Sequence, residues 1–277
     1  MKHRAISLAA VLSGMIVSLA TSFSNAQSTA AGITAKLQDK PLFLRGLWAN
    51  DKLKFDAQGH PAGRYQTAPF TVCGMHVDNV TIHGSHLKLE GQREGIKFAA
   101  DGSMIRVIMH TGSPRDPIPE KMSVEIDNGD SRDFGPAIDA VFTQDPMQLA
   151  PLLPDFWQPY FKKHFGEQQV ASEANPPRQN TGAMHIGGTV RPPRLVHNVE
   201  PQFSEDARRM KYSGNVQVYL WVEEDGSPSH VRIVRPAGMG LDEQAVAAVR
   251  QYQFSPATRE GAPVVVDIYI DVNFQIF

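Results

Sequence analysis

The end of the chain alternates between apolar and polar residues over a long stretch. Every second residue from 264 to 276 is apolar, and most of the residues between them are polar. Successive side chains of a β-strand point to opposite faces, so this pattern predicts a single strand with one apolar face. Such a strand cannot bury its apolar face alone, and other elements must cover it.

The residues before this strand supply a hairpin and two helices. Apolar residues alternate over 216–222, Asp225 and Gly226 predict a turn, and 230–234 predicts the returning strand. Ser204 is a favourable N-cap for a first helix, and an apolar face at helical period predicts a second helix over 241–252. The order helix, strand, strand, helix, strand predicts an α+β module. In that module, both helices cover one face of a three-stranded antiparallel sheet.

Several short blocks in this region stand in the order typical of one family. They are 201–204 with 207–208, 214–218, 224–226, 231–235, 240–245, 249–257 and 261–264. Residues 188–277 therefore resemble the C-terminal domain of TonB-family proteins, whereas the first 165 residues carry no such resemblance. One departure is Phe203-Ser204, where the family commonly has Tyr-Pro before the first helix.

The resemblance implies a protein-binding role in the Gram-negative envelope, in TonB-dependent transport. An extended peptide of an outer-membrane receptor, or of another envelope protein, would add to the edge of the last strand. The expected partner-binding residues are Tyr269, Ile270, Asp271, Val272, Asn273 and Phe274. Asp267 and Asp271 would also protect this edge from aggregation. For the inward-facing residues, the alternative is a purely structural role in the sheet.

The N-terminus has the pattern of a secretory signal peptide. Lys2, His3 and Arg4 precede an apolar run over 5–20, and small residues at 24–26 predict cleavage before Gln27. The alternative is an uncleaved anchor, but a spanning helix needs roughly 20 apolar residues and this run is shorter. We therefore expect a periplasmic or envelope location, with membrane contact only if residues 1–26 remain attached.

The rest of the chain divides into three parts. Residues 27–40 are small and polar and predict a disordered leader. Residues 41–165 predict a β-rich domain of unknown function that ends in short helical turns rich in aromatic residues. Residues 166–187 are polar and Pro-containing and predict a linker to the C-terminal module.

Composition and motifs argue against several other functions. The net charge is -2 and no long basic run occurs, so a nucleic-acid partner is not expected. His76, His83 and His86 match no zinc-binding spacing, and on one alternating strand the last two would point to opposite faces. Cys73 has no neighbouring base to activate it. We expect no catalytic residues, no metal site, no cofactor and no enzymatic activity.

Two features leave alternatives open. Energy transducers of the family usually carry an inner-membrane anchor and a long Pro-rich spacer. This chain has instead a signal-like segment, a predicted β domain and a short linker. The alternative function is a secreted ligand-binding or enzymatic N-terminal domain that the TonB-like module only docks. The aromatic residues Tyr219 and Trp221 would lie on the open sheet face, where they could form a homodimer or partner surface or simply be exposed.

Overall fold

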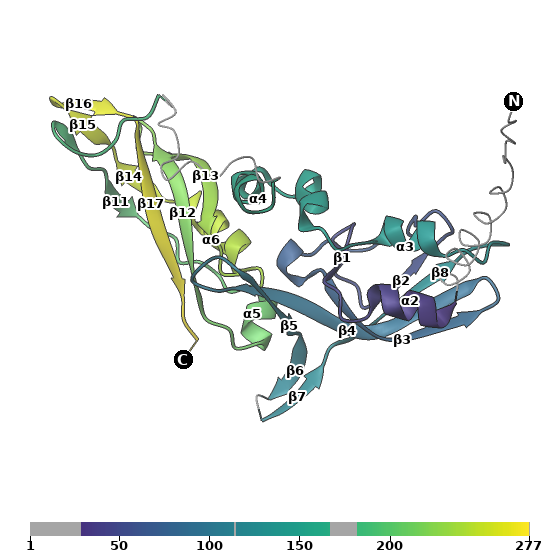
Figure 1. Cartoon of the computed structure of the whole chain (residues 1–277). Coiled ribbons are helices and arrows are strands. Elements are labelled where there is room, and N and C mark those ends of the chain that lie inside the picture. Colours follow the sequence, from purple (N-terminus) through teal and green to yellow (C-terminus); the bar gives the residue numbers. More distant parts are fainter. Residues whose placement is uncertain (1–28, 114, 167–181, 277) are drawn as a thin grey trace, which may run out of the picture.

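The computed structural model describes residues 29–113, 115–166 and 182–276 (Figure 1). A β-rich N-terminal region precedes a mixed α/β C-terminal region. None of the helices in these described ranges is long and apolar enough to cross a membrane. The predicted signal segment, residues 1–26, lies outside the described residues, as does most of the predicted linker.

A seven-stranded sheet forms the N-terminal region. Its order is β2-β8-β4-β3-β1-β9, with β5 also beside β4. The strands are β1 (Leu42–Leu44), β2 (Lys52–Phe55), β3 (Gly74–His83), β4 (His86–Phe98), β5 (Met104–Ile108), β8 (Lys121–Asp127) and β9 (Phe142–Thr143). All pairs are antiparallel except β2 with β8. A hairpin of β6 (His110–Ser113) and β7 (Asp116–Pro119) projects from the sheet (Figure 1).

Helices α2 (Ala30–Leu37) and α3 (Gly135–Val141) share a hydrophobic core with this sheet. Thr29 caps α2 by accepting a hydrogen bond from the N–H of Gly32. The prediction of a disordered leader over 27–40 is therefore wrong for the part that the structure describes. Ile33 and Leu37 lie one turn apart and are both buried, and this apolar pair holds the helix on the sheet.

A helical segment rich in aromatic residues follows the sheet, as short turns broken by proline. It comprises η2 (Pro146–Leu152), η3 (Asp155–Trp157) and α4 (Gln158–Phe165). Trp157 and Phe161 make edge-on contacts with Phe70 of η1 (Phe70–Val72), at 4.8 Å and 4.9 Å between ring centroids. This geometry suits the quadrupoles of the rings, so the aromatic cluster fixes the segment against the sheet.

The C-terminal region has a three-stranded antiparallel sheet in the order β13-β12-β17. The strands are β12 (Gly214–Val222), β13 (Pro228–Arg235) and β17 (Val266–Phe274). The first helix, α5 (Glu205–Arg209), is capped by Ser204, whose hydroxyl accepts a hydrogen bond from the N–H of Ala207. The second helix, α6 (Leu241–Val249), packs against β12 and β13 and ends earlier than the sequence indicated.

Short strands extend this region beyond the sequence-based expectation. Strands β10 (Val190–Arg191) and β11 (Arg194–His197) pair with β15 (Ala257–Arg259) and β14 (Gln253–Ser255). Strand β16 (Ala262–Val264) pairs with β15 and leads into β17. These strands are too short to give a clear periodic pattern in the sequence.

One hydrophobic core spans both regions. It joins the aromatic segment and the end of β4 to the buried faces of β12, β17 and α6. Side chains from both sides of the linker, such as Ile96, Trp157 and Met239, belong to this cluster. The C-terminal region is therefore packed against the N-terminal sheet.

Candidate docking edge

Strand β17 forms one border of the C-terminal sheet. It pairs with β12 in an unbroken antiparallel register from Gly214↔Phe274 to Val222↔Val266. Within the described part of the chain, no strand pairs with residues 268–274 on the other side of β17. An unpaired border of this kind offers backbone N–H and C=O groups to an incoming strand.

At the start of β17, this border already pairs with another segment of the same chain. The N–H of Met184 donates to the carbonyl of Val265 (2.8 Å), and the N–H of Asp267 donates to the carbonyl of Met184 (3.3 Å). This contact is a parallel bridge between Met184 and Val266. The free part of the border therefore begins after Asp267.

The same contact fixes which backbone groups are available. The backbone groups of successive residues in a strand point alternately to its two sides. The N–H of Asp267 points away from β12, and the register has no bulge. The outward backbone groups of the free border therefore belong to Tyr269, Asp271 and Asn273.

The six predicted site residues divide into two sets by side chain. Tyr269, Asp271 and Asn273 are exposed on the face opposite the core, and Tyr269 is 58% exposed. Val272 and Phe274 are buried, and Ile270 is half-buried against the same core. All six lie on one strand, but only the first three present both backbone and side chain to a partner.

The open face beside the border carries a row of aromatic side chains. Tyr219 of β12 lies directly opposite Tyr269, with ring centroids 5.3 Å apart and an edge-on geometry. The guanidinium of Arg232 stacks over the Tyr219 ring at 4.0 Å from its centroid. The indole N–H of Trp221 donates to the Tyr219 hydroxyl. These contacts bury Tyr219 almost completely and hold the row rigid.

The opposite side of the sheet is tied to the N-terminal region. Just after β13, the N–H of Met239 donates to the carbonyl of Ile96 (3.0 Å), and the N–H of Phe98 donates to the carbonyl of Ala237 (3.1 Å). Gly238 lies between these bonds at φ +92°, and a Cβ there would lie 2.1 Å from the Ile96 carbonyl oxygen. Only glycine fits both the backbone angle and the close approach.

The start of α6 continues this attachment. The N–H of Gly240 donates to the Thr71 hydroxyl (3.0 Å), and the Trp157 indole donates to Glu243 (2.9 Å). Asp242 is fully buried and accepts hydrogen bonds from the N–H groups of Ala237 and Gly238. Burial, followed by the neighbouring Glu243, raises the pKa of Asp242 to about 8. Asp242 and Glu243 therefore both serve the attachment of α6 to the N-terminal region.

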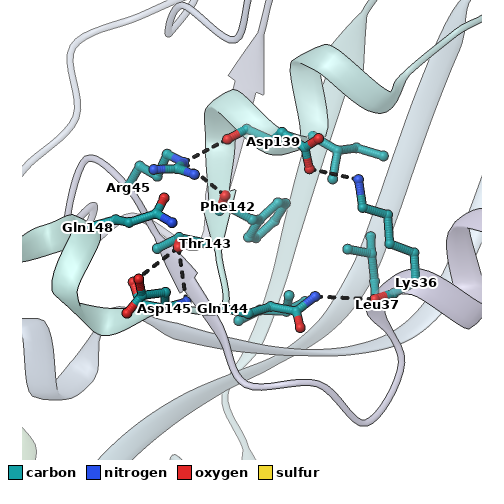
Figure 2. Close-up of a pocket in the computed structure, with 11 residues that line it drawn as sticks. Lys36, Leu37, Arg45, Asp139, Phe142, Thr143, Gln144, Asp145 and Gln148 are labelled. Carbon is teal, nitrogen blue, oxygen red and sulfur yellow. Dashed lines mark hydrogen bonds and ion pairs between the residues drawn. The ribbon is translucent and has the colours of Figure 1, made fainter. Parts of the chain in front are cut away.

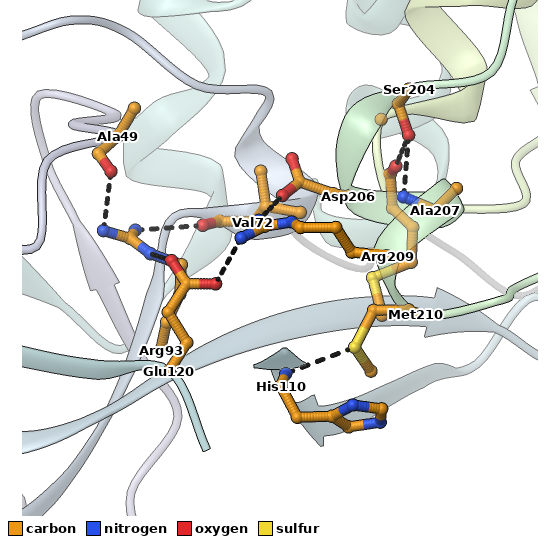
Figure 3. A network of polar contacts seen from close by, with 12 residues as sticks. Ala49, Val72, Arg93, His110, Glu120, Ser204, Asp206, Ala207, Arg209 and Met210 are labelled. Carbon is orange, nitrogen blue, oxygen red and sulfur yellow. Dashed lines mark hydrogen bonds and ion pairs between the residues drawn. The ribbon is translucent and has the colours of Figure 1, made fainter. Parts of the chain in front are cut away.

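A second polar bridge crosses between the regions at α5 (Figure 3). Arg93 is buried in the N-terminal sheet and donates from Nε to Glu120 (3.0 Å). Glu120 also lies 3.1 Å from Nη1 of Arg209 on α5. Figure 3 also shows the N–H of His110 donating to the sulfur of Met210 (3.3 Å). The N-terminal region thus holds the β13 and α5 side, while no strand in the described part of the chain pairs with β17 after Asp267.

The cavities of the N-terminal region offer less to a ligand. The cavity in Figure 2 has about 240 Å³, and its charged groups engage each other: Lys36 pairs with Asp139, and Arg45 donates to the carbonyls of Asp139 and Phe142. A groove of about 530 Å³ on the sheet face carries mixed charges from lysines 52, 88 and 121 and acids 51, 78 and 90. Neither holds an arrangement that points to one ligand class.

The candidate reactive residues are not assembled into a site. Contrary to the sequence argument, His83 and His86 lie directly opposite each other across the β3–β4 turn. In the described ranges, no three His, Cys, Asp or Glu residues are grouped as a metal site would require. Cys73 is buried, and burial raises the pKa of its thiol to about 12, which leaves it unreactive.

Sequence reasoning found the strand but missed the contacts that define its free length. Met184 lies in the predicted linker, where nothing marked it as a pairing residue. Glu243 bonds to the indole of Trp157, which is 86 residues away in the sequence. The one available signal for this contact was Trp157 itself, a large aromatic residue in a segment with no apparent core of its own.

Comparison with known proteins shows which family the region that contains this border resembles. Residues 199–276 match the family described as Gram-negative bacterial TonB protein C-terminal. Protein TonB of Vibrio cholerae is 31% identical over 86 residues, which are 30% of this chain and 35% of the relative. Protein tonB2 of Pseudomonas aeruginosa is 35% identical over 65 residues, 23% of this chain and 24% of the relative.

The matched part contains both helices and all three strands of the C-terminal sheet, including the whole of β17. The chain spans about a third or less of the length of these relatives, and the N-terminal sheet lies outside the matched segment. Residues 199–276 are therefore similar to the C-terminal region of TonB proteins.

Proposed function

We propose that this protein is a non-enzymatic binding protein of the cell envelope that acts in TonB-dependent transport. An extended segment of an outer-membrane receptor, or of another envelope protein, adds as a further strand to β17. The docking residues are those of the free border, 269–274. Tyr269, Asp271 and Asn273 bond the segment, and Ile270, Val272 and Phe274 support the strand from the core side.

One observation carries this proposal. The free border of β17 lies within the segment that matches the TonB C-terminal family, and its outward N–H and C=O groups have no strand partner in the described ranges. Main-chain hydrogen bonds along such a border supply affinity for an extended peptide, and alternate side chains supply selectivity.

The N-terminal region supports the same role by fixing the module. It engages β13, α5 and the start of α6, so an incoming strand meets a rigid sheet with one free side. Pre-organisation of this kind lowers the entropic cost of binding. We propose that the N-terminal region is a scaffold and that the whole protein is exported to the periplasm by residues 1–26.

The test uses proline at a position chosen by the direction of the backbone groups. Asn273→Pro removes one outward N–H and leaves the ladder to β12 intact, which proline tolerates on a border strand. Asn273→Ala is the matched control, because it shortens the side chain but keeps the N–H. Ile270→Pro is unsuitable, because the N–H of Ile270 points toward β12 and its loss would disrupt the sheet.

Binding of a synthetic outer-membrane receptor plug segment to the full chain is measured by pull-down and fluorescence anisotropy. We expect capture by the wild type and by Asn273→Ala, and a loss of about tenfold in affinity for Asn273→Pro with an unchanged circular dichroism spectrum. Equal capture by both variants would refute docking at this border. The export proposal is checked by the mass of the mature protein, which should begin at Gln27.

A further inference from the structure

On the open face of the sheet, β17 presents acidic, aromatic and amide side chains along the free border. Asp267, Tyr269, Asp271 and Asn273 all project from this face, since residues two apart on a strand share a side. No cation of the described residues forms an ion pair with Asp271, whose carboxylate accepts only from the amides of Asn215 (3.4 Å) and Gln217 (3.2 Å). Those neutral amides orient the carboxylate without neutralising it.

Each row across the sheet ends at β17 in a group that suits a cation. Arg232, Tyr219 and Tyr269 form one row, and the arginine stacks on Tyr219. The Tyr269 side chain, at the end of this row, is the most exposed aromatic among the described residues of the C-terminal region. A neighbouring row runs from Arg235 through Gln217 to Asp271. A strand added next to β17 would place one side chain beside Tyr269 and another beside Asp271.

The position beside Asp267, the first aspartate on this border, is already occupied by a basic residue of the same chain. Where the segment around Met184 pairs with β17, His185 Nδ1 lies 3.5 Å from the Asp267 carboxylate. The side chain opposite the first aspartate of the border is thus an imidazole. The second aspartate, Asp271, lies two pairs further along and has no such neighbour in the described structure.

We propose that the segment docked on β17 is cationic on one face, with Lys or Arg at alternate positions opposite Tyr269 and Asp271. This inference rests on the proposed docking at β17 and specifies which sequences the border selects. One basic side chain pairs with the Asp271 carboxylate, and the next on the same face stacks over the Tyr269 ring, as Arg232 does on Tyr219. An acidic segment would meet repulsion from the same carboxylate.

The size of the preference follows from the exposure of these groups. Exposed cross-strand pairs of opposite charge and exposed cation–π contacts are each weak, so the two together give a preference of about threefold to thirtyfold for a basic over a neutral segment. Because the groups are exposed, raising the salt concentration should reduce the preference.

The experiment compares two synthetic nine-residue peptides by fluorescence anisotropy with the full chain. One alternates Lys with Val, and the other alternates Glu with Val. Asp271→Asn removes the charge at the border. Glu260→Gln is the matched control, because it removes one negative charge at an exposed turn outside β17. We expect the Lys peptide to bind at least about threefold more tightly, with the preference reduced in Asp271→Asn and kept in Glu260→Gln.

The outcomes separate this inference from the docking proposal. If both peptides bind equally and Asn273→Pro weakens both, docking at β17 stands and the charge preference is refuted. A Lys preference that survives unchanged in Asp271→Asn also refutes it, since the selectivity then arises elsewhere. If Asn273→Pro alters neither peptide, docking itself fails. If neither peptide binds the wild type, a cationic segment is not the partner.

Discussion

The two sides of the C-terminal sheet are treated in opposite ways. The β13 side is covered by the helical segment over 155–165, and it is fixed by hydrogen bonds from β4 to residues 237 and 239 just after β13 and by the Trp157–Glu243 contact. Strand β17 lies at the other border of the sheet (Figure 1), and its outward backbone groups after Asp267 have no strand partner among the described residues. A sheet of three strands has two borders. Within the described residues, the N-terminal region packs against one of them, and no strand pairs with the other after Asp267. This difference is the basis of the proposed docking at β17.

Removal of an aromatic anchor on each side should have very different effects. Trp157 is fully buried, so Trp157→Ala should lower the free energy of unfolding by about 3–5 kcal/mol. Tyr269→Ala, on the free border, should lower it by under about 1 kcal/mol. Chemical denaturation of both variants provides the measurement. A similar loss in the two would contradict the assignment of a closed and an open side.

Backbone amide exchange sharpens the comparison within β17 itself. The N–H groups of Ile268, Ile270 and Val272 bond to β12, whereas those of Tyr269, Asp271 and Asn273 face outward. We expect the first set to exchange about a hundredfold more slowly than the second. Hydrogen–deuterium exchange monitored by NMR resolves the two sets. Uniform protection along the strand would show that the border is covered.

The contribution of Asp242, on the β13 side, to the stability of the fold should fall as pH rises. The pKa of Asp242 is raised to about 8 by burial, so the folded protein keeps a proton that the unfolded chain releases above its ordinary value of 3.8. Between these values the folded state binds more protons, and stability therefore falls with increasing pH. Asp242→Asn should flatten this dependence between pH 4 and 8 at a cost of about 1–3 kcal/mol. Calorimetric Tm values across this range provide the check.

The polar bridge between Arg209 and Glu120 should contribute least to the free energy of unfolding. Arg209 is partly exposed and pairs with both Asp206 and Glu120. Arg209→Ala should therefore lower the free energy of unfolding by under about 1 kcal/mol. Arg93 is buried and donates to carbonyls as well as to Glu120, so Arg93→Ala should cost several times more. Thermal denaturation of the pair distinguishes the two, and a reversed order would contradict this interpretation of Figure 3.

The C-terminal region was largely predictable because its signals are local. Alternation over 216–222 and 264–276, the Ser204 cap and the Asp225–Gly226 turn each depend on neighbours in sequence. The match over residues 199–276 supports the resemblance that those blocks suggested. The strand that carries the candidate site followed from the same alternation.

The remaining features depend on contacts between distant residues. The direction of each backbone group in β17 was not fixed until the Asp267–Met184 bond was seen, and Met184 carries no local pairing signal. The shared core arises because β4 and the aromatic segment pack beside α6, which periodicity within one element cannot reveal. Helix α2 was missed because only Ile33 and Leu37 mark its buried side in a stretch of small residues.

The bonds between β4 and the residues after β13 have a mechanical consequence. A strand held along β17 would pull on its ladder lengthwise, so that many hydrogen bonds share the tension instead of opening one after another. The tension would pass through β12 and β13 to residues 237–239 and from there into β4, which runs deep into the N-terminal sheet. The route from the free border to the N-terminal region thus runs through the β17–β12 and β12–β13 ladders and the short bridge between Gly238 and Lys97, without passing through the linker.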